Sequence, residues 1–264
     1  MASFEPVRAI TRGLTVLRFV SEKGPITATE LARATKLPQP TIVRILETLI
    51  EGGYVYRQSD GISFCVTARS KTLSSGFDGT SRLLQLAKPL IEELRAEIGW
   101  PSNLAVLEDD AMVIVYTNRN ANGLSIPGRL GARLPLLATA TGIVQLATLQ
   151  ESDRESLLLK LRQSNDVWDT APPLWEGLTE RLANARRDGF AFADERYLDE
   201  IYRSQIWAVA VPIVVKGKAK AAMSSLVLRA AGQRQRLLAK ILPSLRRTAK
   251  MIGDTLSVEE GETN

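Results

Sequence analysis

The sequence predicts an α+β protein with an N-terminal winged helix-turn-helix and a larger C-terminal domain built on a β-sheet. Two short amphipathic helices joined by a proline-containing turn, a β-hairpin directly after them and a later change to strand periodicity support this. A chain of 264 residues exceeds one typical domain. We expect a winged helix-turn-helix over 1–75, a linker helix over 76–98, a sheet domain over 99–252 and a disordered tail over 253–264.

The helix pair occupies residues 27–54. Thr27 and Glu30 form a T-x-x-E capping box, which marks the start of the first helix. Pro38 ends that helix, and Pro40 suits the first turn of the next one, where a missing N–H costs nothing. Apolar residues of the second helix recur at helical spacing and should face the core: Ile42, Ile45, Leu46 and Leu49.

The outer face of the second helix is polar and could reach DNA phosphates or base edges. The same periodicity fits any helical hairpin, so the neighbouring segments decide between the two interpretations. A further amphipathic helix over 10–20 precedes the pair, and an alternating hairpin over 54–66, turning at Asp60, follows it as a wing. This order favours DNA binding. The candidate DNA contacts are Arg12, Thr27, Gln39, Pro40, Thr41, Arg44, Thr48, Arg57 and Asp60.

Composition narrows the function classes. The chain is 45% hydrophobic and 24% charged, and no apolar run is long enough to span a membrane. The single Cys65 agrees with a reducing cytoplasm. There is no histidine and no nucleotide-binding glycine motif, which excludes Ser-His-Asp and Cys-His catalysis but leaves lysine or carboxylate chemistry open. We expect no cofactor and no metal, and the net charge of +5 modestly favours a polyanionic partner.

The second half begins with a predicted hairpin over 104–116 and a third strand over 123–126. The acidic tip at 108–110 is either a metal site or, more commonly, a solvated turn. Thr139 opens a helix whose N-terminal N–H groups could bind an anion. Its small residues could equally serve only close helix-sheet packing.

Later elements complete the sheet domain. Helices are expected over 152–162 and 174–187, strands over 190–192, 206–214 and 221–228, and a closing helix over 234–252. The expected arrangement is a sheet with helices at its edges or on one face.

Several stretches together resemble the IclR family of bacterial transcriptional regulators. They are RAITRGLTVLRFV, TATELARATKLPQPTIVRILETLIEGGYV, RLGARLPLLATATGIVQLA and GFAFADERY. The resemblance implies a GAF-like effector-binding domain, double-stranded operator DNA and a small organic acid as partners, and a homodimer with a tetramer as the alternative. The family commonly has Lys-Ser where this chain has Gln39-Pro40, whereas Thr41 and Arg44 match.

The resemblance also implies the effector contacts. Trp207 stands where keto-acid sensors carry smaller side chains, and an indole there would provide the flat wall that an aromatic acid needs. Segments around Trp100 and Leu134 are similar to members that control aromatic-acid catabolism, although Trp100 could equally be a core residue. The implied contacts are Trp100, Leu104, Leu134, Leu136, Thr139, Ala140, Thr141, Asp194, Trp207, Ser224 and Ser225.

Two other classes compete with a DNA-binding regulator. One is an enzyme that converts a small acid and carries a regulatory winged-helix domain. The other is a winged helix that binds protein and does not touch DNA.

Overall fold

The computed structural model describes residues 5–74, 81–119 and 130–262. The chain divides into two compact units, Met1–Asp78 and Gly79–Asn264. Within the described ranges, no helix is long and apolar enough to cross a membrane.

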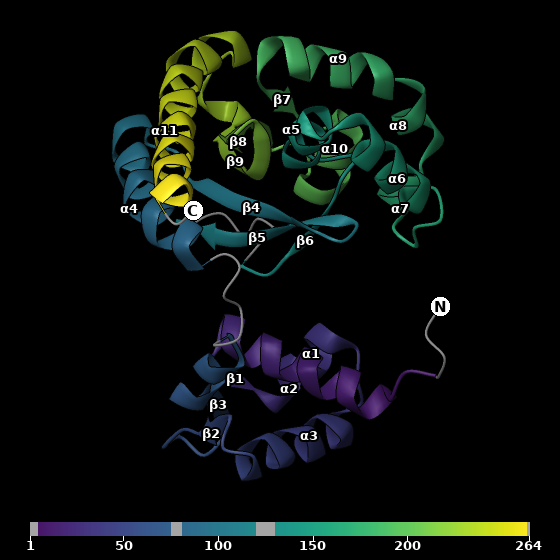
Figure 1. The fold of residues 1–264 in the computed structure, drawn as a ribbon. Coiled ribbons are helices and arrows are strands. Elements are labelled where there is room, and N and C mark those ends of the chain that lie inside the picture. The colour runs from purple at the N-terminus through teal and green to yellow at the C-terminus, as the bar shows by residue number, and fades with distance from the viewer. Residues whose placement is uncertain (1–4, 75–80, 120–129, 263–264) are drawn as a thin grey trace. The chain divides into compact units, whose positions relative to one another are not determined.

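The N-terminal unit is a winged helix-turn-helix, as predicted (Figure 1). Its three short strands form one antiparallel sheet in the order β1-β3-β2. The hairpin of β2 and β3 is the wing. The elements are α1 (Arg8–Lys23), β1 (Ile26–Thr27), α2 (Ala28–Thr35), α3 (Gln39–Glu51), β2 (Val55–Arg57), β3 (Ser63–Val66) and the 3₁₀ helix η1 (Ala68–Ser74).

Local signals fix these helices. The capping box is present: the Thr27 N–H donates to Glu30 Oε2 at 2.9 Å, and the Glu30 N–H donates back to Thr27 Oγ1 at 3.3 Å. Helix α2 ends where Lys36 takes a left-handed conformation, at φ 57°. Ile42 and Leu46 of α3 are fully buried, as their spacing predicts.

Helix α1 is amphipathic, as predicted, but it buries only part of its apolar face. Val16, Leu17 and Val20 are buried, but Ile10 and Leu14 are 61% and 59% exposed. Val7, also exposed, continues the same stripe at helical spacing. We call Val7, Ile10 and Leu14 the α1 stripe.

The C-terminal unit is built on a six-stranded antiparallel sheet in the order β6-β5-β4-β9-β8-β7. The first helix and the strands are α4 (Ser81–Ile98), β4 (Ser102–Glu108), β5 (Ala111–Thr117), β6 (Arg133–Pro135), β7 (Ala191–Phe192), β8 (Ile206–Val215) and β9 (Lys218–Leu228). The other helices are α5 (Ala140–Thr148), α6 (Glu151–Leu161), α7 (Val167–Thr170), α8 (Pro172–Glu176), α9 (Leu178–Asp188), α10 (Glu195–Tyr202), the 3₁₀ helix η3 (Arg229–Ala231) and α11 (Arg234–Glu262).

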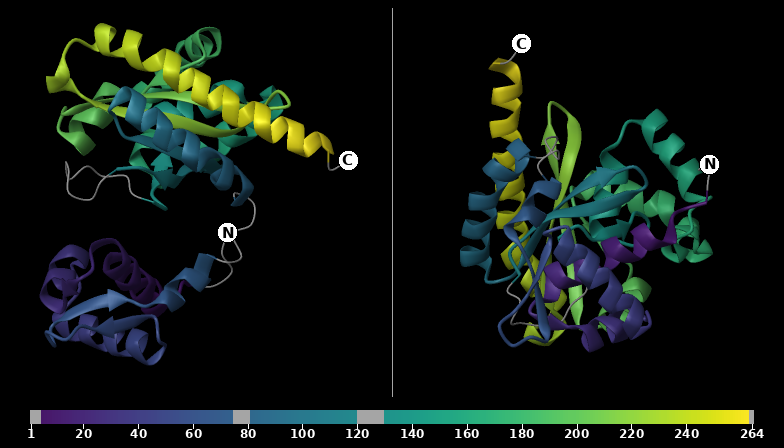
Figure 2. Two further views of the ribbon diagram at one scale, coloured as in Figure 1. Left: turned by 90° about the vertical axis from the view of Figure 1, so that its left-hand side faces the viewer. Right: turned by 90° about the horizontal axis from the view of Figure 1, so that it is seen from below.

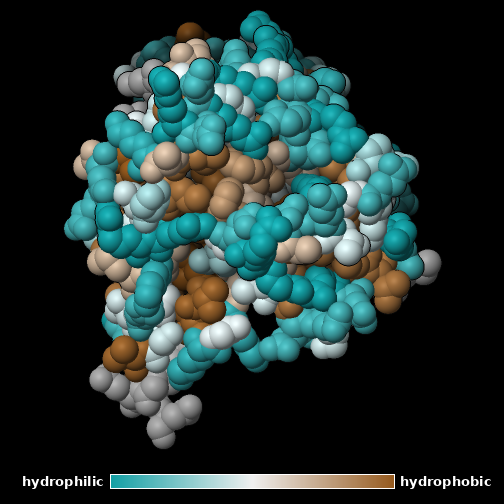
Figure 3. All heavy atoms as spheres, turned by 90° about the horizontal axis from the view of Figure 1, so that it is seen from above, coloured by the Kyte–Doolittle hydropathy of each residue, from teal (hydrophilic) through white to brown (hydrophobic). Residues whose placement is uncertain are grey.

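Helices cover both faces of this sheet. The sequence predicted helices only at its edges or on one face. Helices α4 and α11 lie side by side on one face, and α5 with α9 and α10 on the other (Figures 1 and 2). Each face has its own apolar core. In the space-filling view of Figure 3, apolar residues gather toward the middle and hydrophilic side chains border them.

Helix α11 corrects the predicted tail at 253–264, because it continues past Gly253 to Glu262. A Cβ on Gly253 would lie 2.3 Å from the carbonyl oxygen of Val214, so this glycine permits close packing on β8 and does not end the helix. Ile252 and Leu256 are buried. Glu259 pairs with Arg82 of α4, which joins the end of α11 to the helix expected to be a linker.

Two further elements differ from the sequence prediction. The strand expected at 123–126 lies outside the described residues, and the described strand that pairs with β5 on this side is β6, for which no strand was predicted. Helix α10 was not predicted. Asp194 caps it, its carboxylate accepting from the N–H of Arg196 at 3.0 Å.

Candidate DNA interface and ligand cavity

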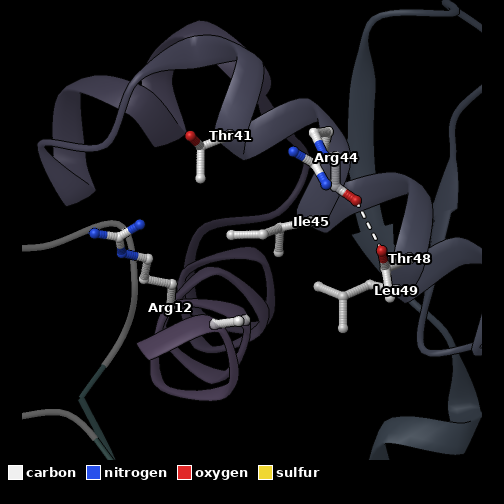
Figure 4. Close-up of a pocket in the computed structure, with 8 residues that line it drawn as sticks. Arg12, Thr41, Arg44, Ile45, Thr48 and Leu49 are labelled. Carbon is white, nitrogen blue, oxygen red and sulfur yellow. Dashed lines mark hydrogen bonds between the residues drawn. The ribbon is translucent and has the colours of Figure 1, made fainter. Parts of the chain in front are cut away.

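A groove of about 410 Å³ separates α1 from α3 in the N-terminal unit. Small residues on α1, Ala9 and Gly13, leave space there between the two helices. The groove brings together Arg12, Thr41, Arg44 and Thr48, which were predicted to contact DNA. In Figure 4, Arg12 extends from α1 on the side of the groove opposite Thr41.

The two arginines give this surface its charge. Arg12 and Arg44 are exposed, and within the described part of the chain neither side chain has an ion pair or hydrogen bond. Thr48 Oγ1 donates to the carbonyl oxygen of Arg44 at 2.9 Å (Figure 4). Two guanidinium groups that are not paired within the described part of the protein suit phosphate oxygens, which accept bidentate hydrogen bonds.

Three predicted contacts lie around the helix-turn-helix itself. Thr27 is engaged in the capping box. Gln39 Nε2 donates to Thr29 Oγ1 at 3.4 Å, which holds the start of α3 against α2. Pro40 occupies the first turn of α3. All three residues help to position α3. Of the three, only Gln39 has a side-chain donor that could bind DNA instead of its present partner.

The two predicted contacts on the wing are engaged within the protein, Asp60 with the wing itself and Arg57 with both the wing and Glu47 of α3. Arg57 donates to Glu47 Oε1 at 2.7 Å and to the Gly61 carbonyl at 3.1 Å, and it lies 5.0 Å from the centre of the Phe64 ring. Asp60 Oδ1 accepts the N–H groups of Ile62 and Ser63, both at 2.9 Å. Hydrogen bonds from Ser63 and Ile62 hold the pKa of Asp60 below its usual value. Both residues therefore fix the shape of the wing.

The C-terminal unit contains a small cavity of about 30 Å³ at the N-terminus of α5. Five predicted effector contacts line it: Leu134, Thr139, Ala140, Thr141 and Ser224. The remaining lining residues come from β4, β5, β8 and β9 and from the segment that includes α10: Asn103, Ile114, Ala193, Tyr197, Leu198, Tyr202, Ala208 and Leu226.

Thr139 organises the polar end of the cavity. Its hydroxyl donates to the Pro135 carbonyl at 2.8 Å and accepts the N–H of Gly142 at 3.2 Å, which caps α5. The other N–H groups of the first turn and the partial positive charge of the helix end are available to an anion. A Cβ on Gly142 would lie 2.2 Å from the Leu136 carbonyl, so the small residue also serves close packing. The packing interpretation of this helix start is confirmed, and anion binding there stays a prediction.

The structure does not bring the other predicted effector contacts to this cavity. Strand alternation explains three of them, because Leu104, Trp207 and Ser225 point to the face covered by α4 and α11. Trp100 precedes β4 and packs on the same face. Leu136 is buried beneath Gly142. Asp194 caps α10 and pairs with Arg196 at 2.9 Å. The prediction that Trp207 forms a flat wall of the ligand site is thus corrected.

Helix α10 supplies the residues that the sequence reasoning missed. Tyr197, Leu198 and Tyr202 are buried and line the cavity. Trp168 packs edge-on against Tyr197 at 5.2 Å between ring centres. Burial raises the pKa of Tyr202, and the nearby Arg119 lowers it in part. The N-cap Asp194 followed by apolar residues at helical spacing was the available signal.

A buried carboxylate supports the segment that leads into α5. Asp169 is 2% exposed, and its Oδ1 accepts the N–H of Leu137 at 3.0 Å. Burial raises the pKa of Asp169 to about 6, and that hydrogen bond offsets only part of the effect. Asp169 therefore links α7 to the segment that leads into α5.

The acidic hairpin tip is held by ion pairs. Asp110 pairs with Arg133 at 2.5 Å, and Asp109 pairs with Lys160 at 3.2 Å. Across the described ranges, no three His, Cys, Asp or Glu side chains are grouped so that they could hold a metal ion. This geometry favours the solvated-turn interpretation.

A winged helix-turn-helix joined to a sheet domain with a small internal cavity defines a DNA-binding regulator that senses a ligand. Residues 9–59 match the IclR helix-turn-helix domain, and residues 79–254 match the family described as bacterial transcriptional regulator IclR C-terminal. The chain belongs to the IclR family of transcriptional regulators.

Curated relatives and solved structures agree with this assignment. The acetate operon repressor of Salmonella typhimurium is 30% identical over 72% of this chain and 70% of its own length. The Pca regulon regulatory protein of Pseudomonas putida is 27% identical over 78% and 68%. An IclR homologue from Microbacterium hydrocarbonoxydans, solved with 4-hydroxybenzoate, is 26% identical, with a TM-score of 0.65 over 95% of this chain and 99% of that one.

Proposed function

We propose that the protein controls transcription of a catabolic operon by binding operator DNA through its winged domain and a small organic acid in the cavity at α5. The observation that carries this is the pairing of two sites: a groove with two unengaged arginines in one unit, and a capped helix N-terminus facing a cavity in the other. The relatives support the catabolic role, since their names concern an acetate operon and the Pca regulon.

DNA contact is assigned to the groove between α1 and α3. Arg12 and Arg44 bind phosphates, and Thr41, Thr48 and Gln39 reach base edges or sugar oxygens. Phosphate contacts by two arginines supply affinity that falls with salt. Arg57 and Asp60 act by holding the wing, and Thr27 and Pro40 by positioning the helices.

The exposed α1 stripe supports a homodimer as part of this proposal. Val7, Ile10 and Leu14 are each about three-fifths exposed on one side of α1. A second copy of the same stripe would bury them, and paired winged domains read two half-sites of an operator.

The effector is a small acid whose carboxylate lies at the N-terminus of α5. The cavity of about 30 Å³ is well below the roughly 150 Å³ of a protein cavity that accepts benzene. Any acid must displace side chains to enter, and an aromatic acid must displace the most. With Trp207 on the other face of the sheet, a small aliphatic acid is favoured, and the aromatic ligand of one relative is the competing outcome.

The ligand is bound without being converted. The described residues that line the cavity are apolar or carry amide and hydroxyl groups, and none is a carboxylate, lysine or cysteine. Binding instead shifts an equilibrium between arrangements of the dimer that fit or do not fit the operator, which requires different affinities for the two.

The test is a thermal-shift screen of aliphatic and aromatic acids, followed by mobility shifts on promoter fragments next to the gene. A ligand that stabilises the protein should also change its operator affinity. Stabilisation by no acid, or an acid that binds and leaves DNA affinity unchanged, would refute the proposal. Conversion of the acid into a product would instead identify an enzyme.

A further inference from the structure

Asn103 is a buried polar residue on β4 that the fold does not use. It is 4% exposed and lines the cavity at α5. Its Oδ1 atom is buried and has no hydrogen-bond partner among the residues that the structure describes. A buried amide oxygen without a donor costs free energy, so an acceptor left in this state calls for an explanation.

A second buried asparagine, directly after β5, shows what a structural role looks like. Asn118 is 8% exposed. Its Oδ1 accepts the N–H of Ser102 at 2.8 Å, and its Nδ2 donates to the Ile91 carbonyl at 3.0 Å. Both ends of that amide are satisfied by the backbone. The Oδ1 atom of Asn103, by contrast, accepts no hydrogen bond from any residue that the structure describes.

The place of Asn103 in the sheet identifies what it faces. It pairs across β4 and β9 with Ser224, and both side chains line the cavity. On the helix side of the same cavity, the α5 N-terminus is suited to a carboxylate. An amide offers one acceptor and two donors, and a serine hydroxyl offers a donor and an acceptor. The two together suit an uncharged oxygen substituent.

We propose that Asn103 binds a second oxygen function of the effector, a hydroxyl or carbonyl group, and thereby selects hydroxy and oxo acids over the corresponding unsubstituted acids. This rests on the proposed function, since the carboxylate of the same ligand occupies the α5 end. A site built to hydrogen-bond a substituent rejects the analogue that lacks it, because its own polar groups then stay unpaired.

Matched acids and matched variants test the assignment. The acids are lactate and pyruvate against propionate, glycolate and glyoxylate against acetate, and 4-hydroxybenzoate against benzoate. The variants are Asn103→Leu, which keeps the size but removes the amide, and Asn103→Ala. Ser102→Ala is the control, because Ser102 is also fully buried and its hydroxyl lacks a partner in the described residues, yet it precedes Asn103 on the opposite face of β4.

Wild-type protein and Ser102→Ala should bind the oxygen-substituted acid of at least one pair about fivefold or more tightly than its partner. Both Asn103 variants should lose that preference while binding the unsubstituted acid within about twofold. Without ligand, Asn103→Leu should melt no lower than wild type, because it removes an unsatisfied buried group. A merely structural asparagine would instead give a lower melting temperature.

The outcomes separate the two proposals. Suppose that acids bind, but a folded Asn103 variant keeps the wild-type preference for the oxygen-substituted acid, or wild type itself has no such preference. Asn103 then does not select the substituent, and only this inference is refuted. If no acid stabilises the wild-type protein, the proposed function fails and the inference fails with it.

Discussion

Ser224 and Ser225 are adjacent on β9 but serve opposite faces of the sheet. Ser224 lines the cavity beside Asn103, whereas Ser225 is fully buried on the other face and its hydroxyl donates to the Pro101 carbonyl at 3.2 Å. We therefore assign Ser224 to the proposed ligand site and Ser225 to stability.

Alanine at each serine should separate these roles. Ser224→Ala should weaken binding of the stabilising acid about fivefold with little change in unliganded stability, because it removes a hydrogen bond made only to ligand. Ser225→Ala should lower the free energy of unfolding by about 1 kcal/mol and leave acid affinity unchanged. Isothermal titration and urea unfolding measure the two quantities. The reverse pattern would show that the faces are misassigned.

Arg44→Ala and Arg12→Ala should each weaken operator binding and reduce the slope of log affinity against log salt by about 1, since each removes one phosphate contact. Arg18→Ala is a suitable control, because Arg18 on α1 already pairs with Glu22 at 3.1 Å. Fluorescence anisotropy over a salt series gives the slopes. An unchanged slope in both variants would show that the groove does not contact DNA phosphates.

Gly142→Ala should destabilise the C-terminal unit by about 2 kcal/mol or more, because the added carbon would overlap the Leu136 backbone. Gly13→Ala is the opposite case. Apart from the neighbouring backbone of α1 itself, no described atom lies within 4 Å of a Cβ at that position, and alanine there should add about 0.5–1 kcal/mol of helix stability. Melting temperatures of the two variants should therefore move in opposite directions.

Asp169 should make stability depend on pH. Its folded pKa of about 6 exceeds the ordinary value of about 3.9, so the folded protein binds more protons than the unfolded chain between these values. The contribution of this residue to the free energy of unfolding therefore falls as pH rises from about 4 to 6 and then levels off.

Asp169→Asn removes that titration. The stability of wild type relative to the variant should fall by about 2 kcal/mol between pH 4 and pH 7.5. Urea unfolding of both proteins across this range measures the difference. A difference that is constant with pH would mean that the carboxyl titrates normally.

The winged helix-turn-helix was predictable because its signals are local. The Thr27 capping box, the prolines around the turn and the spacing of Ile42 and Leu46 each act within a few residues. Sheet faces are different. Whether Ser224 or Ser225 faces the ligand depends on register with β4, which long-range pairing sets, and a shift of one residue exchanges every side chain.

The same limit explains the other corrections. Gly253 looks like a helix end in sequence, and only its contact with Val214 shows that the helix continues. Asn103 carries no motif. We infer its role from a side-chain oxygen that has no hydrogen-bond partner among the described residues, which no sequence pattern records.

Strand β4 lies between the cavity at α5 and the core that contains α4. Along β4, Asn103 faces the cavity, and Leu104, the next residue, is fully buried in the core that also contains Ile91 and Leu94 of α4. A ligand that displaces Asn103 by a fraction of an ångström therefore acts on side chains already in that core, which is close-packed and transmits strain. Helix α4 is the first element of the C-terminal unit after the winged domain in the chain. A single β-strand thus separates the proposed ligand site from the core that contains α4.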